Sequence, residues 1–286
     1  MRARVASLAA VLLVAAAMSG RAQAPTFSAR VDSVRIDVLV TTGNRPIAGL
    51  TREDFEVLDN NVPQVVDFAM FEHMPLNAIL VLDLSGSVSG ERLGQLRTAT
   101  RLVVDRLTPT DKAAVITFSQ FVNVTAELTG NLADVRSALD SPRIGWNTAL
   151  VDAAFGALML GAADTARPLI LIFSDGLDTA SWLTPAAVLD SAKRSEAVVC
   201  AVSTGRTGRR SFLDALADQT GGEVVNLEST RNLAATFVHI LDEFRQRYLI
   251  SYTPRGVSRT GWHDVRIRVK DRMATVKARP GYLVGS

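Results

Sequence analysis

Two patterns of apolar residues divide the chain. Residues 76–246 alternate short continuous apolar runs with amphipathic stretches, whereas the flanking segments 25–75 and 247–286 alternate apolar and polar residues one by one. Continuous runs are typical of strands buried on both faces of a parallel sheet, and strict alternation is typical of strands with one solvated face. The pattern therefore predicts an α/β fold with a doubly wound, mainly parallel sheet, inserted between two β-segments.

The inserted segment alternates predicted strands with predicted helices. The expected strands are 78–83, 113–118, 122–128, 169–175, 197–202 and 223–227, and the expected helices are 90–107, 131–139, 148–163, one that starts at 184, 211–220 and 232–247. The join between the second and third strands is short, which favours an antiparallel pair at an edge of the sheet.

The flanking segments predict strands that need each other. These strands are 31–40, 55–59 and 65–71 before the insertion, and 248–252, 265–269 and 274–278 after it. Neither group has enough strands for a stable domain of its own. We therefore expect one small β-sandwich formed by strands from both ends of the chain.

Oxygen-bearing side chains follow two buried strands of the inserted segment. Asp83, Ser85 and Ser87 come at the end of strand 78–83, and Asp175 ends strand 169–175; Thr148 opens a helical run. Ligands of open α/β sheets collect at the carboxyl ends of the strands. Carboxylate and hydroxyl oxygens suit magnesium, calcium or manganese rather than zinc or copper.

Together, Asp83-x-Ser85-x-Ser87, Thr148 and Asp175-Gly resemble the metal-ion-dependent adhesion site of the von Willebrand factor type A family. The resemblance implies a divalent cation, with Mg²⁺ as the first choice and Mn²⁺ or Ca²⁺ as alternatives. It assigns direct hydroxyl ligands to Ser85, Ser87 and Thr148, whereas Asp83 and Asp175 would bind directly or through water. An aspartate or glutamate of a protein partner would complete the coordination.

The resemblance extends beyond the site. The segments Asp59–Gln64, Thr220–Gly222, Arg247–Pro254 and Arg279–Tyr282 are similar to the exported bacterial branch of this family, of the acidobacterial type. In that branch β-segments flank the A domain on both sides. The implied organisation is an N-terminal β-segment at 25–75, an A domain at 76–246 and a C-terminal β-segment at 247–286.

The N-terminus has the pattern of a secretory signal peptide. Two arginines precede an apolar run over residues 5–18, and small residues follow at Ala22 and Ala24. We expect residues 1–24 to be a signal, cut after Ala22 or Ala24, and an exported protein that is periplasmic or secreted. Retention of the segment as a membrane anchor is the alternative. Cys200, the one cysteine, lies in an apolar run and is expected to be a buried thiol.

Charge and motifs disfavour nucleic-acid binding and catalysis. Removal of the signal takes three arginines and no acidic residue, which leaves 28 basic and 29 acidic side chains and no electrostatic case for a nucleic acid. The chain lacks a nucleophile elbow, a P-loop and a dinucleotide fingerprint. A phosphatase that used Asp83 would need a second carboxylate where Ser85 stands. The histidines are expected to be solvated or packed, and Asp152 and Asp178 to support turns near the site.

A rim of large side chains is expected around the metal. Trp146 and Trp182 flank the threonine and Asp175 loops, and Arg206, Arg209 and Arg210 follow strand 197–202. The alternatives are tryptophans that plug the top of the sheet and a solvated arginine loop. We expect a metal-dependent protein-binding or adhesion module that is not an enzyme. A scaffold protein with a stabilising metal site is the second reading, and a hydrolase is the third; the oligomeric state stays open.

Overall fold

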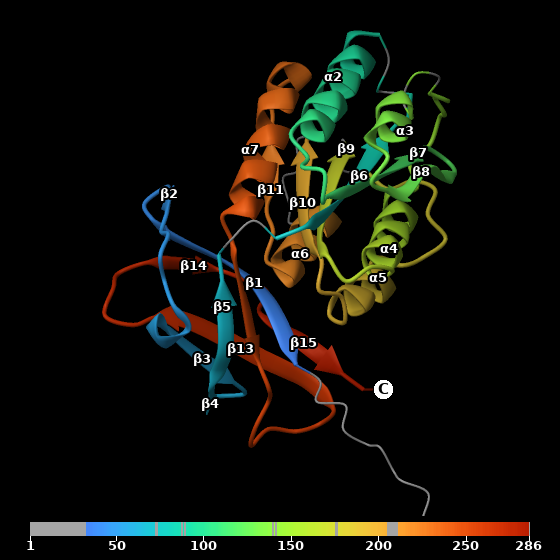
Figure 1. Cartoon of the computed structure of the whole chain (residues 1–286). Helices are drawn as coiled ribbons and strands as arrows, with labels where there is room; N and C mark the ends of the chain where they lie inside the picture. The colour runs from blue at the N-terminus through green and yellow to red at the C-terminus, as the bar shows by residue number, and fades with distance from the viewer. Residues whose placement is uncertain are drawn as a thin grey trace, which may run out of the picture. The chain divides into compact units, whose positions relative to one another are not determined.

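A six-stranded sheet, in the order β11-β10-β9-β6-β7-β8, forms the centre of the inserted segment in the computed structural model (Figure 1). The structure describes residues 33–71, 74–86, 88, 90–138, 140, 142–174, 177–204 and 211–285. Neighbouring strands are parallel from β11 to β7, and β8 is antiparallel to β7 as expected. The strands are β6 Leu76–Asp83, β7 Lys112–Phe118, β8 Val122–Thr129, β9 Arg167–Ser174, β10 Val198–Ser203 and β11 Val224–Asn226.

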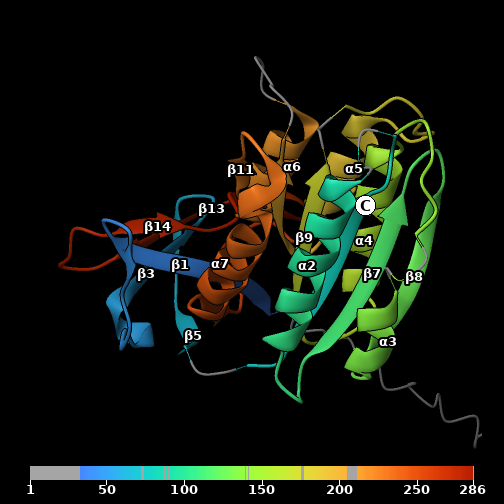
Figure 2. The ribbon, with the colours of Figure 1, turned by 90° about the horizontal axis from the view of Figure 1, so that it is seen from above.

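Helices cover both faces of this sheet (Figure 2). One face carries α2 (Glu91–Asp105), α3 (Leu132–Ser137) and α7 (Leu233–Arg245), and the other carries α4 (Leu150–Gly161), α5 (Pro185–Ala192) and α6 (Phe212–Thr220). An apolar core lies between the sheet and the helices on each face. Two cores are expected because the strands are apolar on both faces. Short 3₁₀ turns occur at η1 (Arg52–Asp54) and η2 (Thr230–Asn232). The predicted doubly wound α/β fold is confirmed.

Local capping fixes where several helices begin. The side chains of Asn131, Thr184 and Ser211 accept a backbone N–H at the starts of α3, α5 and α6, and Pro185 takes the first helical position of α5. The expected helix 148–163 is shorter in the structure, because α4 begins only at Leu150. Thr148 therefore lies in the loop before the helix. No helix among the described residues is both long enough and apolar enough to cross a membrane.

The flanking segments pair with each other as expected. A five-stranded sheet has the order β14-β1-β12-β5, with β2 on β1, and a four-stranded sheet has the order β15-β13-β3-β4. Each sheet thus mixes strands from both ends of the chain, and their inner faces share one apolar core. Strands β2, β4 and β15 were not expected. The strands are β1 Val34–Thr42, β2 Arg45–Pro46, β3 Phe55–Asp59, β4 Val62–Gln64, β5 Val66–Met70, β12 Tyr248–Tyr252, β13 Gly261–Val269, β14 Thr275–Lys277 and β15 Gly281–Val284.

A buried polar cluster inside the sandwich shows how one of the histidines is packed. The Asp59 carboxylate accepts hydrogen bonds from His263 Nδ1 at 2.8 Å, Tyr252 Oη at 2.9 Å and Tyr282 Oη at 2.6 Å. His263 is 1% exposed, and none of the described residues offers a hydrogen-bond partner to its Nε2. His263 is therefore packed against a buried carboxylate, which is one of the two roles expected for the histidines. His239 is exposed on α7, and His73 lies outside the described residues.

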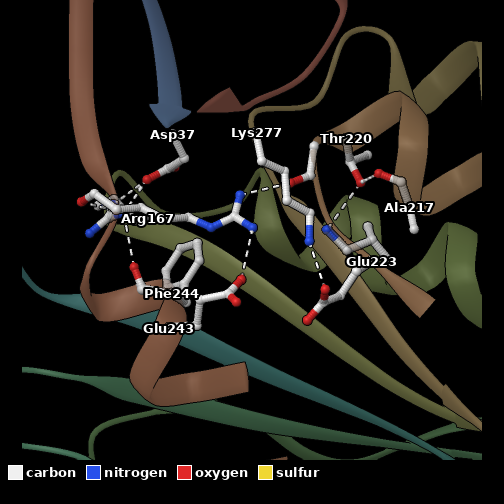
Figure 3. A network of polar contacts seen from close by, with 11 residues as sticks. Asp37, Arg167, Ala217, Thr220, Glu223, Glu243, Phe244 and Lys277 are labelled. Atoms are coloured by element: carbon white, nitrogen blue, oxygen red, sulfur yellow. Dashed lines mark hydrogen bonds and ion pairs between the residues drawn. The ribbon is translucent and has the colours of Figure 1, made fainter. Parts of the chain in front are cut away.

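Polar contacts join the sandwich to the α/β segment (Figure 3). Arg167, at the start of β9, pairs with Asp37 of β1 and donates to the carbonyl of Phe244 at the end of α7. Lys277 of β14 pairs with Glu223 at 2.7 Å. Gly221 has φ +74, and a Cβ there would lie 2.4 Å from the backbone nitrogen of Arg279, so this contact needs glycine.

Candidate functional site

Asp83 is held at the carboxyl end of the central strand. It is the last residue of β6 and is fully buried. One carboxylate oxygen accepts the N–H of Ser85 at 2.8 Å, and the other accepts the hydroxyl of Ser174 at 2.7 Å. Ser174 is the last residue of the neighbouring strand β9. The orientation of the carboxylate is therefore set by two strand ends.

Ser85 and Thr148 come from two loops that contact each other. The hydroxyl-bearing residues Ser85 and Thr148 are 3% and 6% exposed. The N–H of Gly145 donates to the Leu84 carbonyl at 3.0 Å, which joins the loop before Thr148 to the loop after Asp83. The structure thus brings Asp83, Ser85 and Thr148 to one edge of the sheet.

The β9–α5 loop fixes Thr148 from the other side. The N–H of Thr148 donates to Thr179 Oγ1 at 3.0 Å, and the N–H of Thr179 donates to the Thr148 carbonyl at 2.8 Å. Asp152 accepts the N–H groups of Trp182 and Leu183, each at 2.9 Å. Asp178 accepts the N–H of Val151 at 3.2 Å. Asp152 and Asp178 therefore support loops, as expected.

Half of the expected site residues lie outside the part of the chain that the structure describes. They are Ser87 and Asp175 of the expected ligand set, and Arg206, Arg209 and Arg210 of the expected rim. Their assignments stay predictions.

Comparisons with known proteins match the segment that carries these residues. Residues 78–177 match the family model of the von Willebrand factor type A domain, over a range that starts in β6 and includes Asp83, Ser85 and Thr148. The chain contains a von Willebrand factor type A domain. A structure from Catenulispora acidiphila, described as von Willebrand factor type A, has a similar fold, with a TM-score of 0.55 and 14% identity. That similarity covers 88% of this chain and 75% of the other.

Two further relatives share only part of their length with this chain. The inter-alpha-trypsin inhibitor heavy chain H6 of Homo sapiens is 30% identical over 139 residues, which are 43% of this chain but 10% of the human protein. The PilB minor pilin of Streptococcus sanguinis has a similar fold with a TM-score of 0.52 and 11% identity, over 62% of this chain and 63% of the pilin. This chain therefore spans only part of the length of either relative.

The donors at the edge of the A domain fit a hard cation. The described part of the site offers one anchored carboxylate and two hydroxyls, from Asp83, Ser85 and Thr148, and these are the oxygen types that magnesium and calcium prefer. No group of three or more histidine, cysteine, aspartate or glutamate side chains in the described chain is arranged to hold a metal. A soft-metal site of the zinc type is therefore not found among the described residues of the A domain.

The tryptophans of the expected rim project into solvent. Trp146 is 90% exposed and Trp182 is 94% exposed, so neither plugs the top of the sheet. Sequence reasoning missed that Phe121, in the turn between β7 and β8, is 70% exposed and that Leu177 is 67% exposed. The short join after strand 113–118 was the one signal for Phe121, because a tight turn leaves little room to bury a phenylalanine.

Proposed function

We propose that this chain is an exported, metal-dependent protein-binding module. In this proposal Ser85, Ser87 and Thr148 hold a divalent cation through their hydroxyls, and Asp83 and Asp175 hold it directly or through water. The observation that carries the proposal is the Asp83 carboxylate, fully buried and anchored by Ser174, next to the Ser85 loop at the carboxyl edge of the sheet. Mg²⁺ is the proposed ion, with Mn²⁺ and Ca²⁺ as alternatives.

The charge of such a site determines what it binds. Hydroxyl ligands are neutral, so the bound cation keeps much of its positive charge and attracts an external anion. An aspartate or glutamate of a partner protein supplies that anion. The protein binds this carboxylate without transforming it, so we propose a binding module and not an enzyme.

The relatives are consistent with a role outside the cytoplasm. One relative of similar fold is named as a minor pilin. With residues 1–24 as a signal peptide, we place this chain in the periplasm or outside the cell. Association with a membrane would follow only if that segment were retained.

Thermal unfolding with and without metal tests the site. An ion that binds only the folded chain stabilises it by about 2.7 kcal/mol at about 100 times its Kd. For a chain of this size we expect the Tm to rise on the order of 5–10 °C. Asp83→Ala should abolish this increment, whereas Glu127→Gln, an exposed carboxylate of β8, should leave it unchanged.

The informative quantity is the rise of the Tm on addition of metal, and not the Tm itself. Asp83→Ala also removes the acceptor of Ser174 and Ser85, so the variant will melt earlier even without metal. A wild-type Tm that stays constant with saturating magnesium, manganese and calcium would exclude the metal site. A metal increment without any metal-dependent partner would instead favour a purely stabilising ion.

A further inference from the structure

Exposed apolar side chains gather on the loops around the proposed site. They come from the β7–β8 turn, from the loop before α4 and from the loop between β9 and α5. We call this set the apolar crown: Phe121 at 70% exposed, Ile144 at 46%, Trp146 at 90%, Leu177 at 67%, Trp182 at 94% and Leu183 at 37%. Single exposed apolar residues are ordinary, but six on adjoining loops of one edge are typical of a contact surface.

Hydrogen bonds to the backbone fix the two tryptophans of the crown. The N–H of Trp146 donates to Gln120 Oε1 at 3.0 Å, and a Cβ on the preceding Gly145 would lie 2.1 Å from that same oxygen. The N–H of Trp182 donates to Asp152 Oδ2 at 2.9 Å. Both tryptophans therefore project from fixed backbone, which lowers the entropy that a partner must remove on binding.

The crown borders the proposed metal ligand Thr148. Three hydrogen bonds link the loops here. Gln120 accepts the N–H of Trp146, and Thr179 accepts the N–H of Thr148, two residues further along. Asp152 accepts the N–H of Trp182. A partner carboxylate that reaches the cation beside Thr148 would bring its neighbouring surface against both indoles.

Charge on the crown loops does not oppose an acidic partner. Residues 119–121, 142–149 and 177–183 contain one acidic side chain, Asp178, and one basic side chain, Arg143. Asp178 already accepts the N–H of Val151 and the hydroxyl of Ser181. The one acidic and one basic side chain of the crown loops offset each other, so these loops carry no net charge that would repel an aspartate or glutamate.

The area of the crown matches a protein interface. An aromatic side chain buries about 150–250 Å² when it is fully covered, so Phe121, Trp146 and Trp182 together expose on the order of 500 Å². The aliphatic members add to that area. A stable complex needs about 800 Å² from each partner.

We infer that the crown is the main energetic contact for a partner protein whose surface places an apolar hollow beside an acidic residue. This inference rests on the proposed function, because the acidic residue is the one that the cation would bind. The tryptophans fill the hollow and slow dissociation, and the carboxylate fixes the orientation of the partner.

Selection of peptides tests the crown with probes that stand in for the partner. A random-sequence peptide library displayed on phage is selected against the whole chain in magnesium, and the enriched peptides are synthesised as probes. They should combine apolar residues with aspartate or glutamate. Trp146→Ala and Trp182→Ala should each raise the Kd of these probes on the order of 30-fold, which is typical of a hot-spot residue.

Matched variants distinguish binding at the crown from nonspecific binding to exposed apolar side chains. Met273→Ala removes another apolar side chain, 98% exposed but in the sandwich, and should leave the Kd unchanged. Both tryptophan variants should keep the magnesium increment of the wild-type Tm. Probes that bind the tryptophan variants as tightly as the wild type would overturn the crown.

The outcomes also distinguish this inference from the proposed function. Probe binding that needs metal but not tryptophan would reject the crown and leave the proposed function intact. Binding that needs tryptophan but survives chelator would reject the metal-bound carboxylate and keep the crown as an apolar contact. Crown-dependent self-association in sedimentation, or crown-dependent flotation with phospholipid vesicles, would replace the partner protein by a second copy or a lipid surface, and either result would overturn the inference.

Discussion

The ion pair between Asp37 and Arg167 offers the sharpest test of how the two parts of the chain stabilise each other. Asp37 lies on β1 in the sandwich and Arg167 on β9 in the A domain, and both residues are 7% exposed. The Nε of Arg167 donates to Asp37 Oδ1 at 2.6 Å, and Nη2 contacts the same oxygen. Asp37→Ala leaves the guanidinium buried without its counter-charge.

The magnitude follows from the contacts that Arg167 would keep. Removing one partner of a buried pair costs about 3–5 kcal/mol. Arg167 retains two longer bonds of 3.4 Å, to the carbonyls of Phe244 and Arg247, and its guanidinium lies 4.6 Å from the centre of the Phe244 ring. These contacts place Asp37→Ala at the lower end of that range, at about 3 kcal/mol. With an m-value of about 3 kcal/mol per molar, the urea midpoint should fall by about 1 M.

A neighbouring pair supplies the control for this measurement. Arg35, two residues before Asp37 on β1, pairs with Glu196, but these side chains are 39% and 41% exposed. Glu196→Ala should therefore cost less than about 1 kcal/mol. The double variant Asp37→Leu with Arg167→Met should recover most of the loss, because an apolar pair needs no desolvation of charge. Equal urea midpoints for Asp37→Ala and Glu196→Ala would show that the buried pair contributes no more to stability than the exposed pair.

Three other outcomes are expected. Burial raises the pKa of Asp111, but Arg245 and the N–H groups of Thr108 and Leu76 outweigh it and hold that pKa below its ordinary value. The ionised Asp111 carboxylate therefore stabilises the folded chain above the unfolded pKa of about 3.9, and this stabilisation is lost as pH falls through the folded pKa. The urea midpoint should consequently fall less between neutral pH and pH 3 in Asp111→Asn than in the wild type. Deleting residues 248–286 removes the partners of β1 and β3 and should cause aggregation in light scattering; a monomeric, cooperative truncation would contradict the shared sandwich. Burial raises the pKa of Cys200, so its thiol should react with Ellman's reagent only in denaturant; a rapid reaction in the native protein would contradict this.

Local patterns were enough to predict the helices and the longer strands of the fold. Apolar runs such as the one before Asp83 located the buried strands, and the capping residues Asn131 and Thr184 located the starts of two helices. Strands β2, β4 and β15 were missed because they have only two to four residues, too few to show a period. Helix α4 was expected to begin at Thr148, but it begins at Leu150. Thr148 lies in the preceding loop, where its N–H donates to Thr179 Oγ1.

The candidate site was predictable to the extent that its members follow strand ends. Asp83 and Ser85 are two residues apart at the end of β6. Thr148 instead lies in the connection from α3 to α4, which reaches them through the hydrogen bond from the Gly145 N–H to the Leu84 carbonyl. Solvent exposure was not predictable. The residues next to Trp146 and Trp182 in sequence do not show whether these side chains cover the sheet or project from it. The hydrogen bonds that fix their backbone come from Gln120 in the β7–β8 turn and from Asp152 in the first turn of α4.

The buried charges show why the remaining polar contacts could not be predicted. Asp37 and Arg167 are 130 positions apart in sequence, Asp59 and His263 are 204 apart, and Asp111 and Arg245 are 134 apart. A charged residue in a strand or turn is normally solvated, so its sequence position predicts exposure unless the partner is known. Each of these pairs exists only after distant segments have docked, and none adds to the apolar period that predicts secondary structure. All three pairs join segments that are distant in sequence, so we infer that they hold these segments in register.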